Sequence, residues 1–106
     1  GRAKQAYERY KKTYGDNPDA KAVLAFDAMS LIKIGLEHSG EWMCDIAQNR
    51  LNLRNGLHNI TNFDGAGGKI SRFDDNGNPI NKCITIGKVG NDSKPVFIFN
   101  YCPGVF

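Results

Sequence analysis

The chain has 106 residues, the size of one small domain and too short for two independent hydrophobic cores. Its composition, 41% hydrophobic and 24% charged, excludes intrinsic disorder and collagen-like sequence, and no apolar stretch approaches the ~20 residues of a membrane span. Fourteen basic and eleven acidic residues leave a net charge of +3, spread over both halves, which argues against nucleic acid as a partner.

The first predicted helix covers residues 3–14. Tyr7, Tyr10 and Tyr14 lie three and four residues apart, on one side of this helix. Gly15 follows at the position where a left-handed C-terminal cap belongs.

The second predicted helix opens with Asn17-Pro18-Asp19, with Asn17 as its N-cap, and runs to Glu37. Apolar side chains occupy most of its circumference, so we expect neighbours on several sides. Its polar residues form one narrow stripe, made of Asp27, Ser30, Lys33 and Glu37.

A third helix is predicted from Glu41 to Leu51, with Ser39 as its N-cap. Cys44 on this helix is expected to be a small core residue. Residues 52–62 lack periodicity and are predicted to be an irregular connection. The side chains expected to face inward are Trp42, Met43, Ile46 and Leu51.

The second half of the chain predicts short strands joined by turns. After a flexible turn at residues 65–68, the predicted strands are Lys69 to Phe73, Lys82 to Val89 and Pro95 to Tyr101. The last strand is apolar on both faces and is expected to be covered from both sides.

A helix that is apolar around most of its circumference and a strand that is apolar on both faces are typical of the interior of a layered α/β fold. This is the fold class that we predict. A domain of this length buries only ~60–65% of its surface and cannot hide both elements. The chain is therefore expected either to self-associate or to be one piece of a larger protein, and we favour the second.

No catalytic residue, metal ligand or cofactor is predicted. His38 and His58 have no nucleophile elbow or paired carboxylates beside them. The run Asp74-Asp75-Asn76-Gly77-Asn78 resembles the start of a calcium loop, but the sixth and twelfth positions hold Pro79 and Thr85, so a hairpin turn is predicted instead.

The three cysteines form no C-x-x-C pair, which gives a zinc site little support. Cys83 and Cys102 can face each other across a hairpin that turns near Asn91-Asp92-Ser93, and a bridge between them would imply an oxidising compartment. The alternative, free buried thiols, is the more common state.

The order of motifs resembles the C-terminal part of bacterial type I periplasmic binding proteins, the group that contains leucine/isoleucine/valine-binding proteins of ABC importers. The first half contributes Tyr10-Lys11-Lys12-Thr13-Tyr14-Gly15, Asn17-Pro18-Asp19-Ala20 and Leu24-Ala25-Phe26-Asp27-Ala28-Met29. The second half contributes Phe63-Asp64-Gly65-Ala66-Gly67-Gly68-Lys69-Ile70-Ser71 and Phe73-Asp74-Asp75-Asn76-Gly77-Asn78-Pro79.

The resemblance implies a fragment of a two-lobed α/β protein that closes on its ligand by hinge motion. Residues 1–80 would form the C-terminal part of the first lobe, and residues 81–106 would cross over and add a terminal hairpin to the second lobe. In members of the family, a residue just before the aromatic-Asp-Ala helix borders the ligand cleft. The matching positions in this chain are Ala20 and Lys21.

The function implied is extracytoplasmic solute binding, without catalysis, for an ABC importer. The ligand would be an amino acid or a similar small polar metabolite, and the partner an ABC permease. The protein would be periplasmic, or membrane-anchored in a Gram-positive cell, and the isolated fragment is expected to self-associate. Two alternatives stay open: a sensory ligand-binding domain with the same fold, and a self-contained α+β domain of unknown role.

Overall fold

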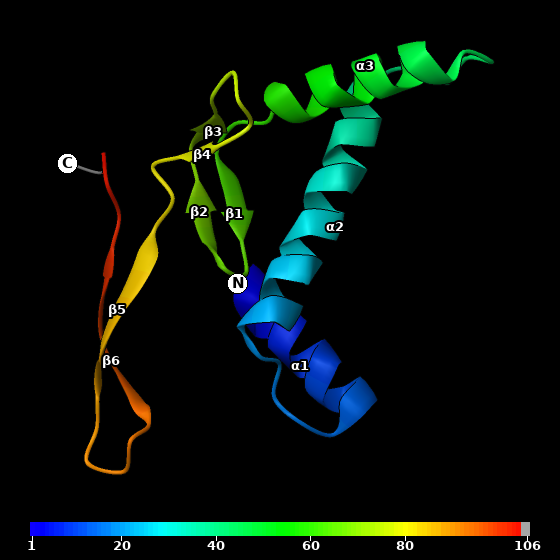
Figure 1. Ribbon diagram of the computed structural model, residues 1–106. Helices are drawn as coiled ribbons and strands as arrows, with labels where there is room; N and C mark the ends of the chain where they lie inside the picture. The colour runs from blue at the N-terminus through cyan, green and yellow to red at the C-terminus, as the bar shows by residue number, and fades with distance from the viewer. Residues whose placement is uncertain (105–106) are drawn as a thin grey trace.

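Figure 1 shows the computed structural model, which describes residues 1–104. Within these residues the chain forms three helices and then six short strands, and the strands pair as three separate antiparallel hairpins. The mixed α/β class predicted from the sequence is confirmed.

Helix α1 spans Arg2–Tyr14 and ends as its sequence predicts. Gly15 adopts a left-handed conformation with φ of 76°, and its amide donates a hydrogen bond to the carbonyl of Lys11. Glycine adopts this conformation without the steric cost that a Cβ atom brings.

Helix α2 spans Ala20–His38, and its N-cap is Asp19. The carboxylate of Asp19 accepts a hydrogen bond from the amide of Ala22 at 2.8 Å. The prediction of Asn17 as the cap is wrong, because Pro18 restricts the residue before it to an extended backbone, and Asp19 directly precedes the first helical turn.

Helix α3 spans Ile46–His58, so the predicted bounds Glu41 to Leu51 are wrong at both ends. It begins late because the carboxylate of Asp45 caps it by accepting a hydrogen bond from the amide of Gln48. It continues through residues that were predicted to be irregular, because Leu53 and Leu57 pack against α2.

Glycines allow α2 and α3 to cross at close range (Figure 1). The α-carbon of Gly56 lies against the carbonyl oxygen of Gly35, and both residues are buried. A side chain at Gly56 would collide with the main chain of α2, whereas one at Gly35 would meet the side chains of Leu53 and Leu57.

The segment between α2 and α3 is a loop rather than a helical turn. The buried side chain of Asn49 holds it: the Asn49 carbonyl accepts from the amide of Met43 at 2.8 Å, and its amide donates to the carbonyl of Met43 at 2.6 Å. Cys44 is exposed and free, which corrects the core position predicted for it. The side chains predicted to face inward are exposed as well: Trp42, Met43, Ile46 and Leu51.

The first two hairpins are short, and the first of them lies beside α2 (Figure 1). Strand β1 (Phe63–Gly65) pairs with β2 (Gly68–Ile70), and β3 (Arg72–Phe73) pairs with β4 (Pro79–Ile80). The predicted strand from Lys69 to Phe73 is therefore divided at Ser71.

The third hairpin stands apart from the helices (Figure 1). Strand β5 (Ile84–Val89) pairs with β6 (Pro95–Tyr101), with a register irregularity between Ile86 and Gly87. Both strands match their predicted positions closely, and every residue of β6 is exposed.

The hydrophobic core is small. It consists of Ile60, Phe63 and Ile70, and no side chain in residues 1–104 is completely enclosed. The partly buried side chains packed against it are Leu31, Ile34, Leu57 and Phe73.

The chain is also extended, with a radius of gyration of 16.6 Å where a compact domain of this length has about 13 Å. Its accessible surface is 8279 Å², roughly 40% more than a compact monomer of its mass exposes.

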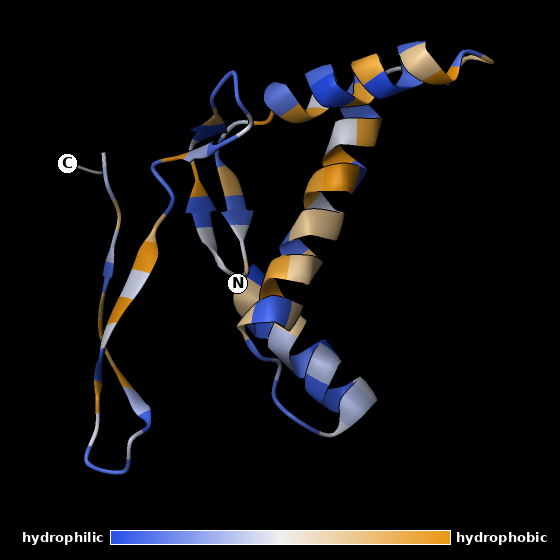
Figure 2. Cartoon of the chain, viewed as in Figure 1, coloured by the Kyte–Doolittle hydropathy of each residue, from blue (hydrophilic) through white to orange (hydrophobic). Residues whose placement is uncertain are grey.

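Many apolar side chains are exposed. Figure 2 shows apolar residues along the whole of α2 and on both strands of the β5–β6 hairpin. Leu24, Met29 and Ile32 of α2 are exposed, and so are the apolar side chains of both faces of β6. The expectation that these two elements exceed what the chain can cover is confirmed. No helix in residues 1–104 combines the length and the apolar character that crossing a membrane requires.

Candidate functional site

A large cavity lies where the start of α2, the β1–β2 hairpin and the base of the β5–β6 hairpin meet. It is an open cleft of about 880 Å³. Residues 64–71 form one wall, and the ends of β5 and β6 form another. Besides small and apolar residues, the cleft is lined by Asn62, Asp64, Lys69, Asn81, Thr85 and Asn100, and Ala20 lies at the start of α2.

One wall of the cleft is held in place by a buried carboxylate. Asp27 is 7% exposed, and its two oxygens accept hydrogen bonds from the amides of Ala66 and Gly67, both at 2.7 Å. These bonds tie the turn between β1 and β2 to the middle of α2. A Cβ atom at Gly65 would lie 2.6 Å from the Asp27 carboxylate, so the close approach requires glycine there.

The two sequence-predicted site residues occupy different positions. Ala20, the first residue of α2, lines the cleft. Lys21 follows it on the helix, is exposed, and is outside the set of residues that line the cleft. The cap at Asp19 fixes where the helix starts and so places Ala20 at the cleft.

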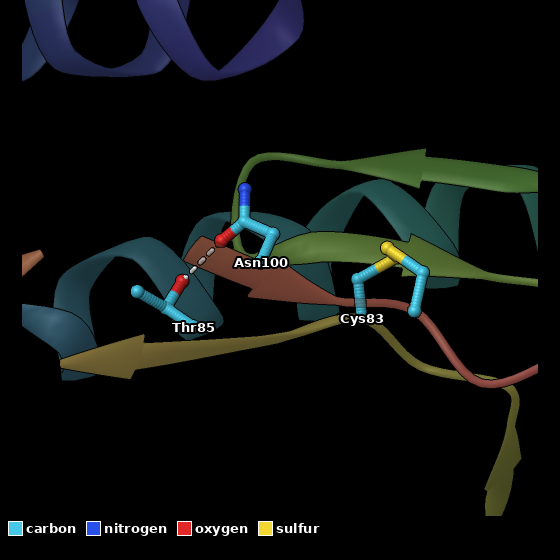
Figure 3. Close-up of a disulfide and its surroundings, with 4 residues drawn as sticks. Cys83, Thr85 and Asn100 are labelled. Atoms are coloured by element: carbon cyan, nitrogen blue, oxygen red, sulfur yellow. Dashed lines mark hydrogen bonds between the residues drawn. A yellow bond between two sulfur atoms is a disulfide. The ribbon is translucent and has the colours of Figure 1, made fainter. Parts of the chain in front are cut away.

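A disulfide joins Cys83 to Cys102 across the open end of the β5–β6 hairpin (Figure 3). The sequence had left a bridge and free buried thiols as alternatives, and the structure selects the bridge. Both cysteines line the cleft.

A polar pair lies next to the disulfide on the same hairpin. Thr85 and Asn100 are cross-strand partners, and the Thr85 hydroxyl donates a hydrogen bond to the Asn100 side-chain oxygen at 2.9 Å (Figure 3). Because side chains two residues apart share a face of a strand, Cys83 and Thr85 point to the same side. The side-chain amide of Asn100 keeps its donor group for another partner.

No motif in the sequence marks Asn62, Asn81, Thr85 or Asn100 as site residues, although all four line the cleft. Asn100 is a polar residue in a strand that is otherwise apolar on both faces, and it is the cross-strand partner of Thr85. Only the tertiary structure shows that both residues line the same cleft as Ala20.

The cleft is lined by one negatively charged and one positively charged side chain. Asp64 and Lys69 are paired across the β1–β2 hairpin, so a carboxylate and an ammonium group lie at the same wall. Within residues 1–104 no His, Cys, Asp and Glu side chains gather as a metal site. The cleft is lined by amides, hydroxyls and two opposite charges together with apolar residues such as Val23 and Leu24, which suits a small solute that carries polar groups.

Comparison with known proteins gives one clear structural match. No protein-family profile matches the sequence, and no curated protein matches it. The crystal structure of a leucine binding protein, LivK, from Thermotoga maritima superposes with a TM-score of 0.74 and 28% sequence identity. The match covers 96% of this chain and 27% of the LivK chain, so the chain spans about a quarter of that protein's length. The chain therefore has the fold of one part of a type I periplasmic binding protein, a solute-binding fold.

Proposed function

We propose that the chain is part of an extracytoplasmic solute-binding protein of an ABC importer, which binds an amino acid or a similar small polar metabolite and presents it to a membrane permease. The observation that carries the proposal is the structural likeness to the leucine binding protein over 96% of the chain. Binding needs no covalent chemistry, and hinge closure of two lobes would enclose the ligand.

The proposed division is residues 1–80 in the first lobe and residues 81–106 in the second. Two features support it. The β5–β6 hairpin stands apart from the helices (Figure 1), and its apolar side chains are exposed, as expected of strands whose neighbours belong to another part of a protein. Residue Asn81, at the proposed boundary, has a left-handed φ of 53° where the chain leaves β4.

We propose that Ala20 and Lys21 border the ligand. The position of Ala20 in the lining of the cleft supports this proposal. Lys21 is exposed at the start of α2 and would lie at the rim of the cleft. A small side chain at Ala20 leaves space in the cleft, so the size of the ligand side chain is set by other residues.

Ligand binding by the intact protein tests the proposal. Isothermal titration with each of the common L-amino acids, starting with L-leucine, is expected to give one-to-one binding with a roughly micromolar dissociation constant for at least one. The melting temperature of the protein should rise with the concentration of the same ligand, because a ligand that binds only the folded state stabilises that state. If no amino acid and no small polar metabolite binds, the proposal fails.

Transport needs a separate test. Cells that lack the intact protein are expected to take up the radiolabelled ligand more slowly, and a periplasmic or surface fraction should contain the protein. Unchanged uptake in those cells, with binding retained in vitro, would favour the sensory role over transport.

A further inference from the structure

Asn100 carries the one side-chain amide of β6, whose other side chains are apolar or aromatic. Successive side chains of a strand point to opposite faces, so Asn100 lies on the face opposite to Phe99 and Tyr101. Asn100 lines the cleft, and its two neighbours are outside the cleft lining. The strand therefore directs a polar group, rather than an aromatic ring, at the cleft.

The base of the β5–β6 hairpin lies against the β1–β2 hairpin, which forms another wall of the cleft. The amide of Cys83 donates a hydrogen bond to the carbonyl of Lys69 at 3.1 Å. Cys83 is bonded to Cys102 across the hairpin, and Thr85 and Asn100 are an adjacent cross-strand pair. These contacts place the Asn100 side chain at the cleft wall.

A hydrogen bond fixes the orientation of the Asn100 amide. The Thr85 hydroxyl donates to the Asn100 side-chain oxygen at 2.9 Å. Figure 3 shows the oxygen atoms of the two side chains facing each other and the Asn100 nitrogen pointing away from Thr85. That nitrogen carries two N–H donors, and within residues 1–104 neither of them donates to another protein group.

Two other asparagines of the cleft lack such an orienting bond. Asn62 and Asn81 both line the cleft, and within the described part of the chain their side-chain amides make no hydrogen bond. Binding to either amide would have to restrict its rotation, which costs conformational entropy. The Asn100 amide is already oriented, so it can bind a ligand atom with a smaller loss of entropy.

We infer that Asn100 is a ligand-contact residue of the cleft, whose side-chain N–H donates a hydrogen bond to a carboxylate or carbonyl oxygen of the bound solute. Thr85 is its positioning residue. The inference rests on the proposed function, since it assigns a residue to the same solute site. A donor held in this orientation favours ligands that present an oxygen acceptor to it and disfavours an ammonium group at the same place.

The test titrates the intact protein and four variants with each of the common L-amino acids by isothermal calorimetry. Asn100→Asp replaces the N–H donor by an acceptor of nearly the same shape and keeps an oxygen for the Thr85 hydroxyl. Asn91→Asp is the matched control, because it makes the same charge change at the exposed turn of the same hairpin, outside the cleft lining. Thr85→Val removes the orienting hydroxyl, whereas Thr85→Ser keeps it. Circular dichroism and a thermal melt establish that each variant folds.

The amino acid that binds the wild type is expected to bind about tenfold or more weakly to Asn100→Asp, and within about twofold of the wild type to Asn91→Asp. Thr85→Val should bind roughly threefold to fivefold more weakly, because its Asn100 amide is no longer oriented, and Thr85→Ser should restore the affinity. In isotope-labelled protein, the NMR signals of the Asn100 side-chain amide should shift on ligand addition, while those of Asn91 should not.

Wild-type affinity in Asn100→Asp would overturn the inference and leave solute binding intact. So would a loss of affinity in Thr85→Val that Thr85→Ser does not restore, since Thr85 would then act through packing rather than through its hydroxyl. A wild-type protein that binds no amino acid and no small polar metabolite would overturn the proposed function and this inference together.

Discussion

The carboxylate of Asp27 and the amide of Ala66 are joined by a 2.7 Å hydrogen bond across 39 residues of sequence. With the second bond, to Gly67, it connects the middle of the most apolar helix to the tip of a two-stranded hairpin. This connection fixes the position of one wall of the cleft, so the shape of the cleft depends on a residue that does not line it.

Replacement of Asp27 should therefore destabilise the intact protein. Asp27→Ala leaves two backbone amides without their acceptor and is expected to cost about 1–3 kcal/mol of unfolding free energy, as measured by urea denaturation. Asp27→Asn should cost less, because one side-chain oxygen is still available. Asp64→Asn, at an exposed carboxylate on the same hairpin, is the control and should change little. An Asp27→Ala protein that unfolds at the same urea concentration as the wild type would contradict the assignment.

The helix crossing predicts different outcomes at its two glycines. Gly56→Ala places a methyl group against the backbone carbonyl of Gly35, which cannot move without shifting α2, and should destabilise the protein by about 2–3 kcal/mol. Gly35→Ala meets side-chain atoms of Leu57 and Leu53, which can shift more readily than main chain. The cost of moving them is offset by ~1 kcal/mol of better helix propensity, so this variant should lose less stability than Gly56→Ala. Denaturant midpoints should separate the two variants clearly, and equal midpoints would show that the crossing is looser than the structure has it.

The β3–β4 turn should depend on pH. The backbone amide of Asn78 is the largest cause that lowers the pKa of Asp74 below its ordinary value of 3.8; the Asn78 side-chain amide also lowers it, and burial opposes the shift. Because the folded-state pKa is depressed, the stabilisation is present above pH 3.8 and is lost as the pH falls through the lower, folded value.

An NMR titration of the Asp74 carboxyl carbon measures this pKa directly. Hydrogen exchange at the Asn78 amide should accelerate, relative to intrinsic rates, as Asp74 becomes protonated. Asp74→Asn removes the charge and should abolish the pH dependence of that protection. A titration midpoint at or above 3.8 would refute the prediction.

Substitutions at the start of α2 test the proposed ligand position. Ala20→Trp fills the cleft and is expected to weaken binding by about tenfold or more, since every 1.4 kcal/mol of lost binding energy is tenfold in affinity. Lys21→Ala, at the exposed rim, should stay within about twofold of the wild type. Titration of both proteins with the same amino acid makes the comparison, and an Ala20→Trp protein that binds as well as the wild type would move the site elsewhere.

The exposed apolar strand predicts the behaviour of the isolated chain. Phe97 and Phe99 are 62% and 50% exposed on β6, so the 106-residue chain alone should sediment as a species larger than a monomer. Phe97→Asn with Phe99→Asn should reduce this association, whereas Tyr14→Asn, at an exposed aromatic on α1, should not. A wild-type chain that sediments as a compact monomer would show that the strand needs no cover.

The helix cap and the turns could be predicted from the sequence, because they depend on residues that are close together in the chain. The left-handed cap at Gly15 and the turns at residues 75–78 and 90–93 depend on glycine, asparagine and aspartate, whose conformational preferences act within a few residues. The resemblance to periplasmic binding proteins was also visible in motif order, and the structural match confirms it.

Tertiary contacts decided the rest. Asp27 was placed in a polar stripe on α2 because its neighbours at helical spacing are polar, yet its partners are amides 39 and 40 residues away. Helix α3 continues to His58 because it packs on α2, an interaction that its own weak periodicity does not show. The cleft brings Ala20 and Asn100 together from opposite ends of the chain, and no sequence pattern connects them.

Trp42 is the single tryptophan of the chain, and it lies 63% exposed on a loop that the amide of Asn49 holds in place. Its fluorescence should accordingly be red-shifted and open to acrylamide quenching while the loop stays in water. Contact of this loop with another surface would shift the emission to shorter wavelength and slow the quenching. The fluorescence of Trp42 therefore reports directly whether another protein surface contacts the loop between α2 and α3.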